Sequence, residues 1–197
     1  SEKYDDAGKA FSKVVDLQHK GSPGRLDALR NLCAAADKKA EQSKSEADQK
    51  VAVAAYTKLL ADAPNDAEAI GSRADLQLAL KLYKEAIADY TKLISVAPSG
   101  PEAIAAYNNR AIAYLSLPTP DYKSAIADYG QVIAKQPNDP AAYNLRAIAN
   151  LKLGDFKAAV PDLDKYLSLK PGDSAALLNR GNAYFNLANT LRTSNSK

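Results

Sequence analysis

The chain's one cysteine and one histidine are the first candidates for chemistry. Cys33 could act as a nucleophile if His19 activated it, which requires an accessible thiol beside the imidazole. The sequence places Cys33 on an apolar helical stripe and His19 just before the turn-forming residues 21–24. We therefore interpret Cys33 as a buried, unreactive packing residue. His19 is expected at a helix C-terminus, where a cation is favoured.

Other catalytic or ligand-binding arrangements are not found in the sequence. One thiol and one imidazole cannot form a disulfide or a zinc site of the usual kind. The glycines near residue 21 lack the lysine and hydroxyl of a phosphate loop, and no paired carboxylates stand out from the charged helix faces. We expect no catalytic residue, no metal ligand and no cofactor, and hence no enzyme activity within these residues.

Four arginines recur at intervals and raise the question of an anion-binding row. Arg73, Arg110 and Arg146 each precede alanine, and Arg180 precedes glycine. Because they recur in step with small core residues, we interpret them as structural. Their stems are expected to pack between helices while each guanidinium reaches a nearby carboxylate or carbonyl.

A regular array of helices must position these residues. Pro64, Pro98, Pro137 and Pro171 are each followed by small turn-forming residues, and two of the three intervals between them are 34 residues. Upstream of each proline is an amphipathic segment, represented by residues 86–90 (Ala-Ile-Ala-Asp-Tyr). The alanine, the residue four later and an apolar residue three beyond that share one helical face. This face is expected to be buried against a neighbouring helix.

Each of the last three amphipathic segments, those upstream of Pro98, Pro137 and Pro171, is preceded by another helix that has a small residue of its own. Alanine at positions 74, 111 and 147, and glycine at 181, would let two helix backbones approach closely. The turn between the two helices ends in an aromatic residue, Tyr83, Tyr122 or Phe156, and the turn before Tyr122 has two additional residues.

These spacings resemble the tetratricopeptide repeat (TPR) family, with its small residue at position eight, alanine at twenty, aromatic at twenty-four and proline at thirty-two. The resemblance implies an all-α fold, a right-handed superhelical solenoid of antiparallel helix pairs. It divides the chain as follows: 1–66, irregular N-terminal helices with a half-repeat and one degenerate repeat; 67–100, a repeat; 104–139, a repeat with the two-residue loop insertion; 140–173, a repeat; 174–190, a C-terminal capping helix; 191–197, a frayed tail. Residues 101–103 are expected to be an insertion between repeats.

The N-terminal third fits the pattern less well. Tyr4, Ala7, Phe11 and Val14 have the spacing of a second helix without its first, so the chain is expected to begin within a repeat. A helix is expected over residues 24–40, and the polar residues 41–49 are expected to form a widened loop. Pro161 lies near the start of its helix, where its missing N–H would cost little.

The resemblance also implies a binding surface, because the first helices of this family line the concave side of the stack. Mapping by repeat position gives the candidate groove residues Asp75, Asn108, Asn109, Ile112, Asn144, Ile148, Lys152, Asn179, Asn182 and Asn186. Asparagine offers both donors and an acceptor, so a row of them could bind the backbone of an extended chain. The alternative, that they only hydrate an exposed helix face, stays open.

The family's carboxylate clamp for chaperone tails is not expected. Gly71, Asp75, Ala141 and Leu145 occupy four positions at which the clamp has a lysine, an asparagine, a lysine and an arginine. Only Asn109 matches the clamp.

The overall charge restricts the partner. The 26 basic and 23 acidic residues are interspersed and give +3, so we expect no nucleic-acid partner. No apolar run is long enough for a membrane helix, so a soluble chain with no targeting segment is expected.

The leading hypothesis is a module that binds a protein or peptide in the groove. Alternatives are self-assembly through the terminal helices and the regulatory part of a larger enzyme.

Overall fold

The computed structural model describes residues 2–194, and of residues 191, 193 and 194 only the backbone. Within that part of the chain all regular structure is helical, and ten helices follow one another through short turns. They are α1 (Glu2–Leu17), α2 (Pro23–Ser43), α3 (Glu46–Asp62), α4 (Ala67–Ala79), α5 (Tyr83–Val96), α6 (Pro101–Leu115), α7 (Tyr122–Lys135), α8 (Pro140–Leu153), α9 (Phe156–Leu169) and α10 (Ser174–Ser194).

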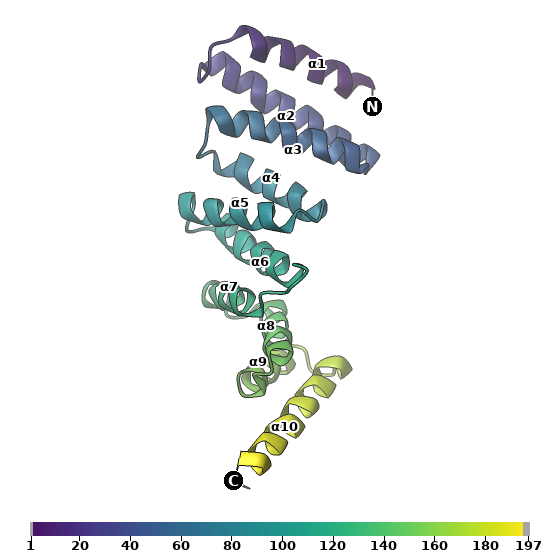
Figure 1. The fold of residues 1–197 in the computed structure, drawn as a ribbon, viewed down its shortest axis with the longest axis vertical. Coiled ribbons are helices and arrows are strands. Elements are labelled where there is room, and N and C mark those ends of the chain that lie inside the picture. Colours follow the sequence, from purple (N-terminus) through teal and green to yellow (C-terminus); the bar gives the residue numbers. More distant parts are fainter. Residues whose placement is uncertain (1, 195–197) are drawn as a thin grey trace. The chain divides into compact units, whose positions relative to one another are not determined.

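The chain forms two compact units, residues 1–106 and 107–197. In unit 1, each of α1 to α4 packs against the next helix (Figure 1). In unit 2, α7 packs on α8, α8 on α9, and α9 on α10. Short turns between packed neighbours make consecutive helices antiparallel. The predicted fold class, an all-α stack of antiparallel helix pairs, is confirmed.

Small residues form the seam of each pair, as the spacing predicted. Ala74 of α4 and Ala86 of α5 have no exposed surface, and the same holds for the pairs Ala111 with Ala125 and Ala147 with Ala159. Alanine at these positions lets two helix axes approach closely without a cavity. A larger side chain there would force the helices apart.

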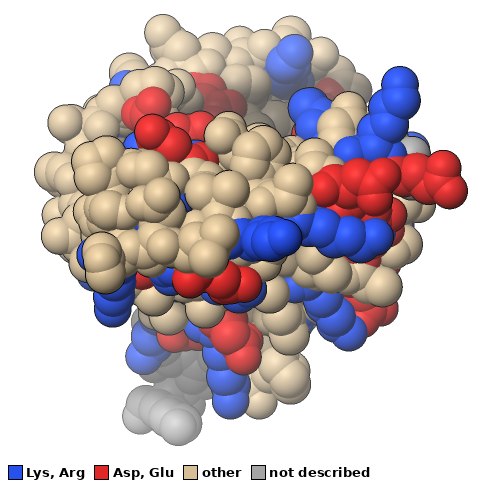
Figure 2. Space-filling model, turned by 90° about the horizontal axis from the view of Figure 1, so that it is seen from above, with Lys and Arg blue, Asp and Glu red and all other residues tan. Residues whose placement is uncertain are grey.

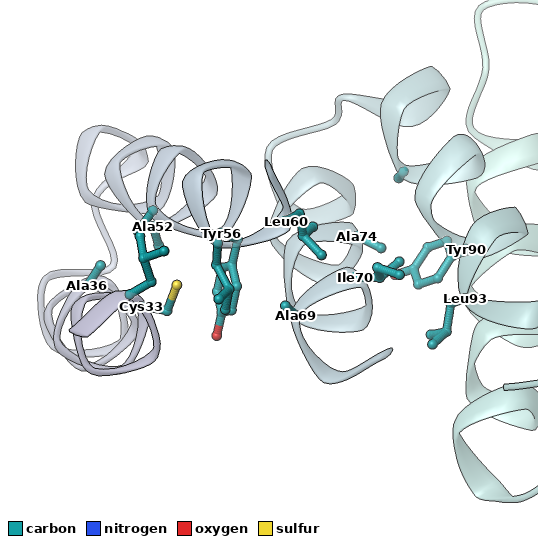
Figure 3. Close-up of a cluster of buried hydrophobic side chains, with 14 of the residues drawn as sticks. Cys33, Ala36, Ala52, Tyr56, Leu60, Ala69, Ile70, Ala74, Tyr90 and Leu93 are labelled. Atoms are coloured by element: carbon teal, nitrogen blue, oxygen red, sulfur yellow. The ribbon is translucent and has the colours of Figure 1, made fainter. Parts of the chain in front are cut away.

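Unit 1 has a continuous apolar core that extends along its helices (Figure 3). Tyr56 of α3 and Tyr90 of α5 are buried in it with Ile70 of α4, and Cys33 of α2 is only 2% exposed. The prediction that Cys33 is buried is therefore confirmed.

Two sequence-based boundaries differ from the structure, one at 41–49 and one at the end of the last helix. The expected loop at 41–49 is helical except around Lys44, whose left-handed backbone (φ 52°) ends α2, and Ser45, which caps α3 through the Asp48 N–H. Glutamate, glutamine and lysine are good helix formers, so a polar stretch did not require a loop. The inserted residues 101–103 form the first turn of α6, because Pro101 suits the start of a helix.

At the C-terminus, α10 continues to Ser194 instead of ending at 190. The predicted frayed tail therefore includes four helical residues, and its last residues, 195–197, lie outside the described residues. Pro161 is accommodated within a continuous α9.

Candidate functional site

The three internal arginines are all engaged in paired hydrogen bonds with a carboxylate. Arg110 donates from Nε to Asp128 Oδ2 at 2.8 Å and from Nη2 to Asp128 Oδ1 at 2.6 Å. Arg73 makes the same two contacts with Asp89, both at 2.7 Å, and Arg146 makes them with Asp162 at 2.8 and 2.6 Å. The structural interpretation of these arginines is confirmed.

The carboxylate partners were not identified from the sequence, although a signal was present. The second helices α5, α7 and α9 each have an aspartate three residues after the seam alanine, and the first helix of each of these pairs carries the arginine. The pair α2 and α3 has neither the arginine nor the aspartate: Ala35 of α2 is at the arginine position, and Ala55 of α3 is at the aspartate position. The hydrogen bond to Asp128 raises the pKa of Arg110 above its ordinary value. These side chains hold helix pairs together and are not available as an anion site.

Arg180 differs from the other three. Its Nη1 donates to Asp164 Oδ1 of the preceding helix at 2.8 Å, and both side chains are substantially exposed. No second helix follows α10 in the described residues, so the usual partner position is empty there.

Tyrosines of the second helices connect the core to the first-helix surface. Tyr90 donates its hydroxyl to Asp75 Oδ1 at 2.6 Å, and Tyr56 donates in the same way to Asp37. Asp75, one of the predicted groove residues, is thus held by the tyrosine of its own repeat. Tyr129 occupies the equivalent position in α7, but Ile112 replaces the aspartate, and the buried Tyr129 hydroxyl has no partner among the described residues.

Unit 1 contains a cavity of about 320 Å³ between the first helices α2 and α4, with α3 beneath. Its walls include Asp37 of α2, Asp66 and Glu68 at the start of α4, and Tyr56 of α3. Arg30 is the only basic residue in the lining, and it pairs with Asp66 at 3.3 Å. The cavity was not predicted from the sequence, because most of its lining residues lie before residue 67, in the irregular repeat.

The cavity is electrostatically negative. Burial, together with the nearby charges of Asp37 and Asp66, raises the pKa of the Cys33 thiol to about 12. Burial also raises the pKa of Asp37, against the lowering effect of the hydrogen bond from Tyr56. A thiol in this environment stays protonated, so Cys33 is not suited to nucleophilic chemistry.

The predicted groove residues of unit 2 lie on α6, α8 and α10, and most are half-buried or exposed. They are Asn108, Asn109 and Ile112 on α6; Asn144, Ile148 and Lys152 on α8; and Asn179, Asn182 and Asn186 on α10. The Asn108 amide donates to Asn109 Oδ1 at 3.4 Å. The Asn186 amide donates to the Asn182 carbonyl of its own helix at 2.8 Å. The last contact favours a local role for Asn186.

Three observations on the described residues concern charge, metal binding and membrane crossing. Acidic and basic side chains are interspersed on the face drawn in Figure 2. No group of three or more His, Cys, Asp or Glu within the described residues could hold a metal ion. Among the helices described here, none has the length and hydropathy needed to cross a bilayer.

Comparison with known families identifies the class of this chain. Tetratricopeptide repeat family models match residues 50–104 and 112–183, which together are more than half of its length. The chain belongs to the tetratricopeptide repeat family, as the spacing of its prolines, alanines and aromatic residues predicted. A comparison with curated proteins finds no significant match.

Solved structures of the same fold include three instructive relatives. MamA is 21% identical with a TM-score of 0.67, covering 79% of this chain and 82% of its own. YrrB, described as a TPR protein with an unusual peptide-binding site, is 18% identical with a TM-score of 0.67, covering 92% and 86%. The first TPR of Spaghetti (RPAP3), bound to the HSP90 peptide SRMEEVD, is 25% identical with a TM-score of 0.53, covering 62% and 93%.

Proposed function

We propose that this chain is a protein-interaction module that binds an extended peptide or a partner helix along the surface of its first helices. The observation that carries the proposal is the cavity of about 320 Å³ in unit 1, flanked by α2 and α4. It has the size of a site for one or two ligand side chains. By contrast, Arg73, Arg110 and Arg146 form ion pairs within the chain, so these recurring arginines are not proposed as peptide-binding residues.

The chemistry of the cavity restricts the peptide. The HSP90 peptide held by the Spaghetti TPR ends in the acidic sequence EEVD. Here Asp37, Asp66 and Glu68 line the cavity, and Arg30 is already paired with Asp66. Burying an acidic side chain among these carboxylates would be unfavourable. This supports the sequence-based expectation that the chain has no clamp for acidic chaperone tails.

In unit 2 the asparagines are the proposed peptide contacts. Asn109, Asn144 and Asn179 lie one each on the successive first helices α6, α8 and α10, and all three are half-buried. A half-buried amide keeps its orientation better than a fully exposed one and still reaches a ligand. Such amides can bond the N–H and C=O groups of an extended chain without reading its sequence.

Selection from a display library of random peptides would provide ligands, whose affinities are then measured by fluorescence anisotropy. Ala34 lines the cavity and is exposed, so Ala34→Phe should fill it and weaken binding by about tenfold or more. The matched control is Ala54→Phe, at an exposed position of α3 outside the cavity lining. Equal affinity of both variants and the parent would exclude the cavity as the binding site.

The asparagines are tested with the same peptides. The combined change of Asn109, Asn144 and Asn179 to alanine should reduce affinity, while Asn138→Ala, in the exposed turn before α8, should not. Circular dichroism checks that the variants keep their helices. Unchanged affinity of a folded triple variant would refute the role of these amides.

A further inference from the structure

The floor of the unit 1 cavity is apolar. Cys33 of α2, Tyr56 of α3 and Ala69 of α4 all line it, and they are 2%, 7% and 2% exposed (Figure 3). Leu59, also 2% exposed, adds an aliphatic side chain to the same lining. A floor of this kind suits a ligand side chain that has a hydrocarbon stem.

The walls of the cavity carry an excess of negative charge. Asp37, Asp66 and Glu68 are accompanied by one basic residue, Arg30. Arg30 is paired with Asp66, which also accepts the Ala69 N–H at 3.1 Å and so caps the start of α4. No ion pair among the described residues includes Asp37 or Glu68. The cavity therefore offers two carboxylates to a cationic ligand group.

Asp37 differs from the other sheltered carboxylates of the chain. Four of them pair with an arginine at 2.6 or 2.7 Å; these are Asp62, Asp89, Asp128 and Asp162. Asp37 is half-buried within α2, and its hydrogen-bond donor among the described residues is the Tyr56 hydroxyl, which reaches Oδ2. Desolvation raises the pKa of Asp37, and a cation placed beside the carboxylate would offset that cost. The second oxygen, Oδ1, is left to accept from a ligand.

We propose that the cavity binds an arginine side chain of the peptide ligand, with its guanidinium paired to Asp37 and its stem packed on Cys33, Tyr56 and Leu59. This inference rests on the proposed peptide-binding function and specifies which residue of the peptide enters the cavity. Arginine suits the site better than lysine, because the guanidinium is less strongly hydrated than an ammonium and loses less on partial burial. Its planar fork also carries more donors than one carboxylate uses, so Glu68 at the rim can share it.

A subtractive selection tests the type of residue. Random peptides displayed on phage are selected on the parent chain, and those that also bind Ala34→Phe are removed. The remaining peptides should share an arginine. The whole chain carries a net charge of +3, so general electrostatic attraction would not enrich cationic peptides. A set of cavity-dependent peptides without a shared arginine would overturn the proposal.

A double-mutant cycle between peptide and protein tests the contact with Asp37. Citrulline has the shape of arginine without its charge, so replacing the shared arginine with citrulline should weaken binding to the parent chain by about tenfold or more. Asp37→Asn should weaken binding of the arginine peptide by a similar factor. Against Asp37→Asn, citrulline should cost little further affinity, because the partner carboxylate is already absent. Equal losses from citrulline on both proteins would refute the pairing.

The matched control is Asp16→Asn, which removes the same charge from an exposed side chain of α1 outside the cavity lining and should leave the affinity unchanged. An equal loss in Asp16→Asn would show that net charge, rather than the cavity, governs binding. Asparagine at 37 keeps an oxygen acceptor for Tyr56, and circular dichroism checks that the variant is folded. The citrulline peptide tests the parent chain directly and needs no protein variant.

The outcomes separate this inference from the function on which it rests. If Ala34→Phe weakens binding and citrulline does not, the cavity binds peptide but takes no arginine, and only the present proposal fails. If Ala34→Phe binds every selected peptide as the parent does, the cavity is not the binding site, and both proposals fail.

Discussion

Removing one hydroxyl from each of two equivalent tyrosines should change stability in opposite directions. Tyr90 and Tyr129 are both fully buried second-helix residues at the same repeat position. The Tyr90 hydroxyl donates to Asp75 at 2.6 Å, and the Tyr129 hydroxyl has no partner among the described residues. Phenylalanine keeps the ring and the packing, so each substitution isolates the hydroxyl.

The expected magnitudes follow from these environments. A hydrogen bond to a charged group contributes about 1.5–3 kcal/mol, and Asp75 is exposed enough for water to replace part of it, so Tyr90→Phe should cost about 1.5 kcal/mol. Burying a hydroxyl without a partner costs about 1–3 kcal/mol, so Tyr129→Phe should stabilise by about 1 kcal/mol. At about 2–4 °C per kcal/mol, the two variants should differ by several degrees in Tm.

The two tyrosines lie in different units, so the assay should resolve each unit. Hydrogen exchange of the α5 and α7 amides reports local stability around Tyr90 and Tyr129, and urea unfolding followed by circular dichroism gives the total change. Equal destabilisation by both substitutions would refute the reasoning, because it would mean that the Tyr129 hydroxyl is also satisfied.

A designed aspartate provides the control. Ile112 occupies the position of Asp75 and is 36% exposed, so Ile112→Asp should give the Tyr129 hydroxyl the missing acceptor. A double-mutant cycle with Tyr129→Phe should show a favourable coupling of about 1–2 kcal/mol. A coupling near zero would show that the tyrosine and the residue at 112 do not meet as they do in the α4 and α5 pair.

Three further predictions concern the ion pairs and the cavity. Asp128→Ala should destabilise by about 3 kcal/mol in urea unfolding because it leaves the half-buried Arg110 unpaired, whereas replacing both residues with apolar ones of similar size should recover most of the loss. Burial raises the pKa of Asp37 above 3.8, so the folded chain binds a proton at Asp37 more readily than the unfolded chain does. The free energy of unfolding should therefore rise, relative to that of Asp37→Asn, as the pH falls from neutral toward the raised pKa of folded Asp37. Parallel curves of stability against pH for the two proteins would contradict this. Cys33, 2% exposed with a pKa of about 12, should resist a thiol reagent at mildly alkaline pH until urea unfolds the chain, and rapid labelling of the native protein would refute its burial.

The N-terminal third shows where the sequence pattern is informative and where it is not. The apolar stripe through Leu29 and Cys33 predicted a buried helix, and α2 buries both residues. The polar run after it contains no periodic apolar signal, so its helical continuation could not be predicted from hydrophobic spacing. Tertiary packing on α1 and α3 contributes to the length of α2, through contacts such as those of Lys39 with Asp5 and Asp48.

The sequence by itself determined the class of the protein. Seam alanines, aromatic residues and prolines recur at fixed intervals, and each repeated unit buries the same face against its neighbours, so the pattern specifies stacked helix pairs. The internal role of the arginines followed from the same periodicity. Only the tertiary structure decided which carboxylate each arginine meets and that the Tyr129 hydroxyl lacks the acceptor found by Tyr90. These are contacts between side chains distant in sequence, and their geometry depends on how two helices pack.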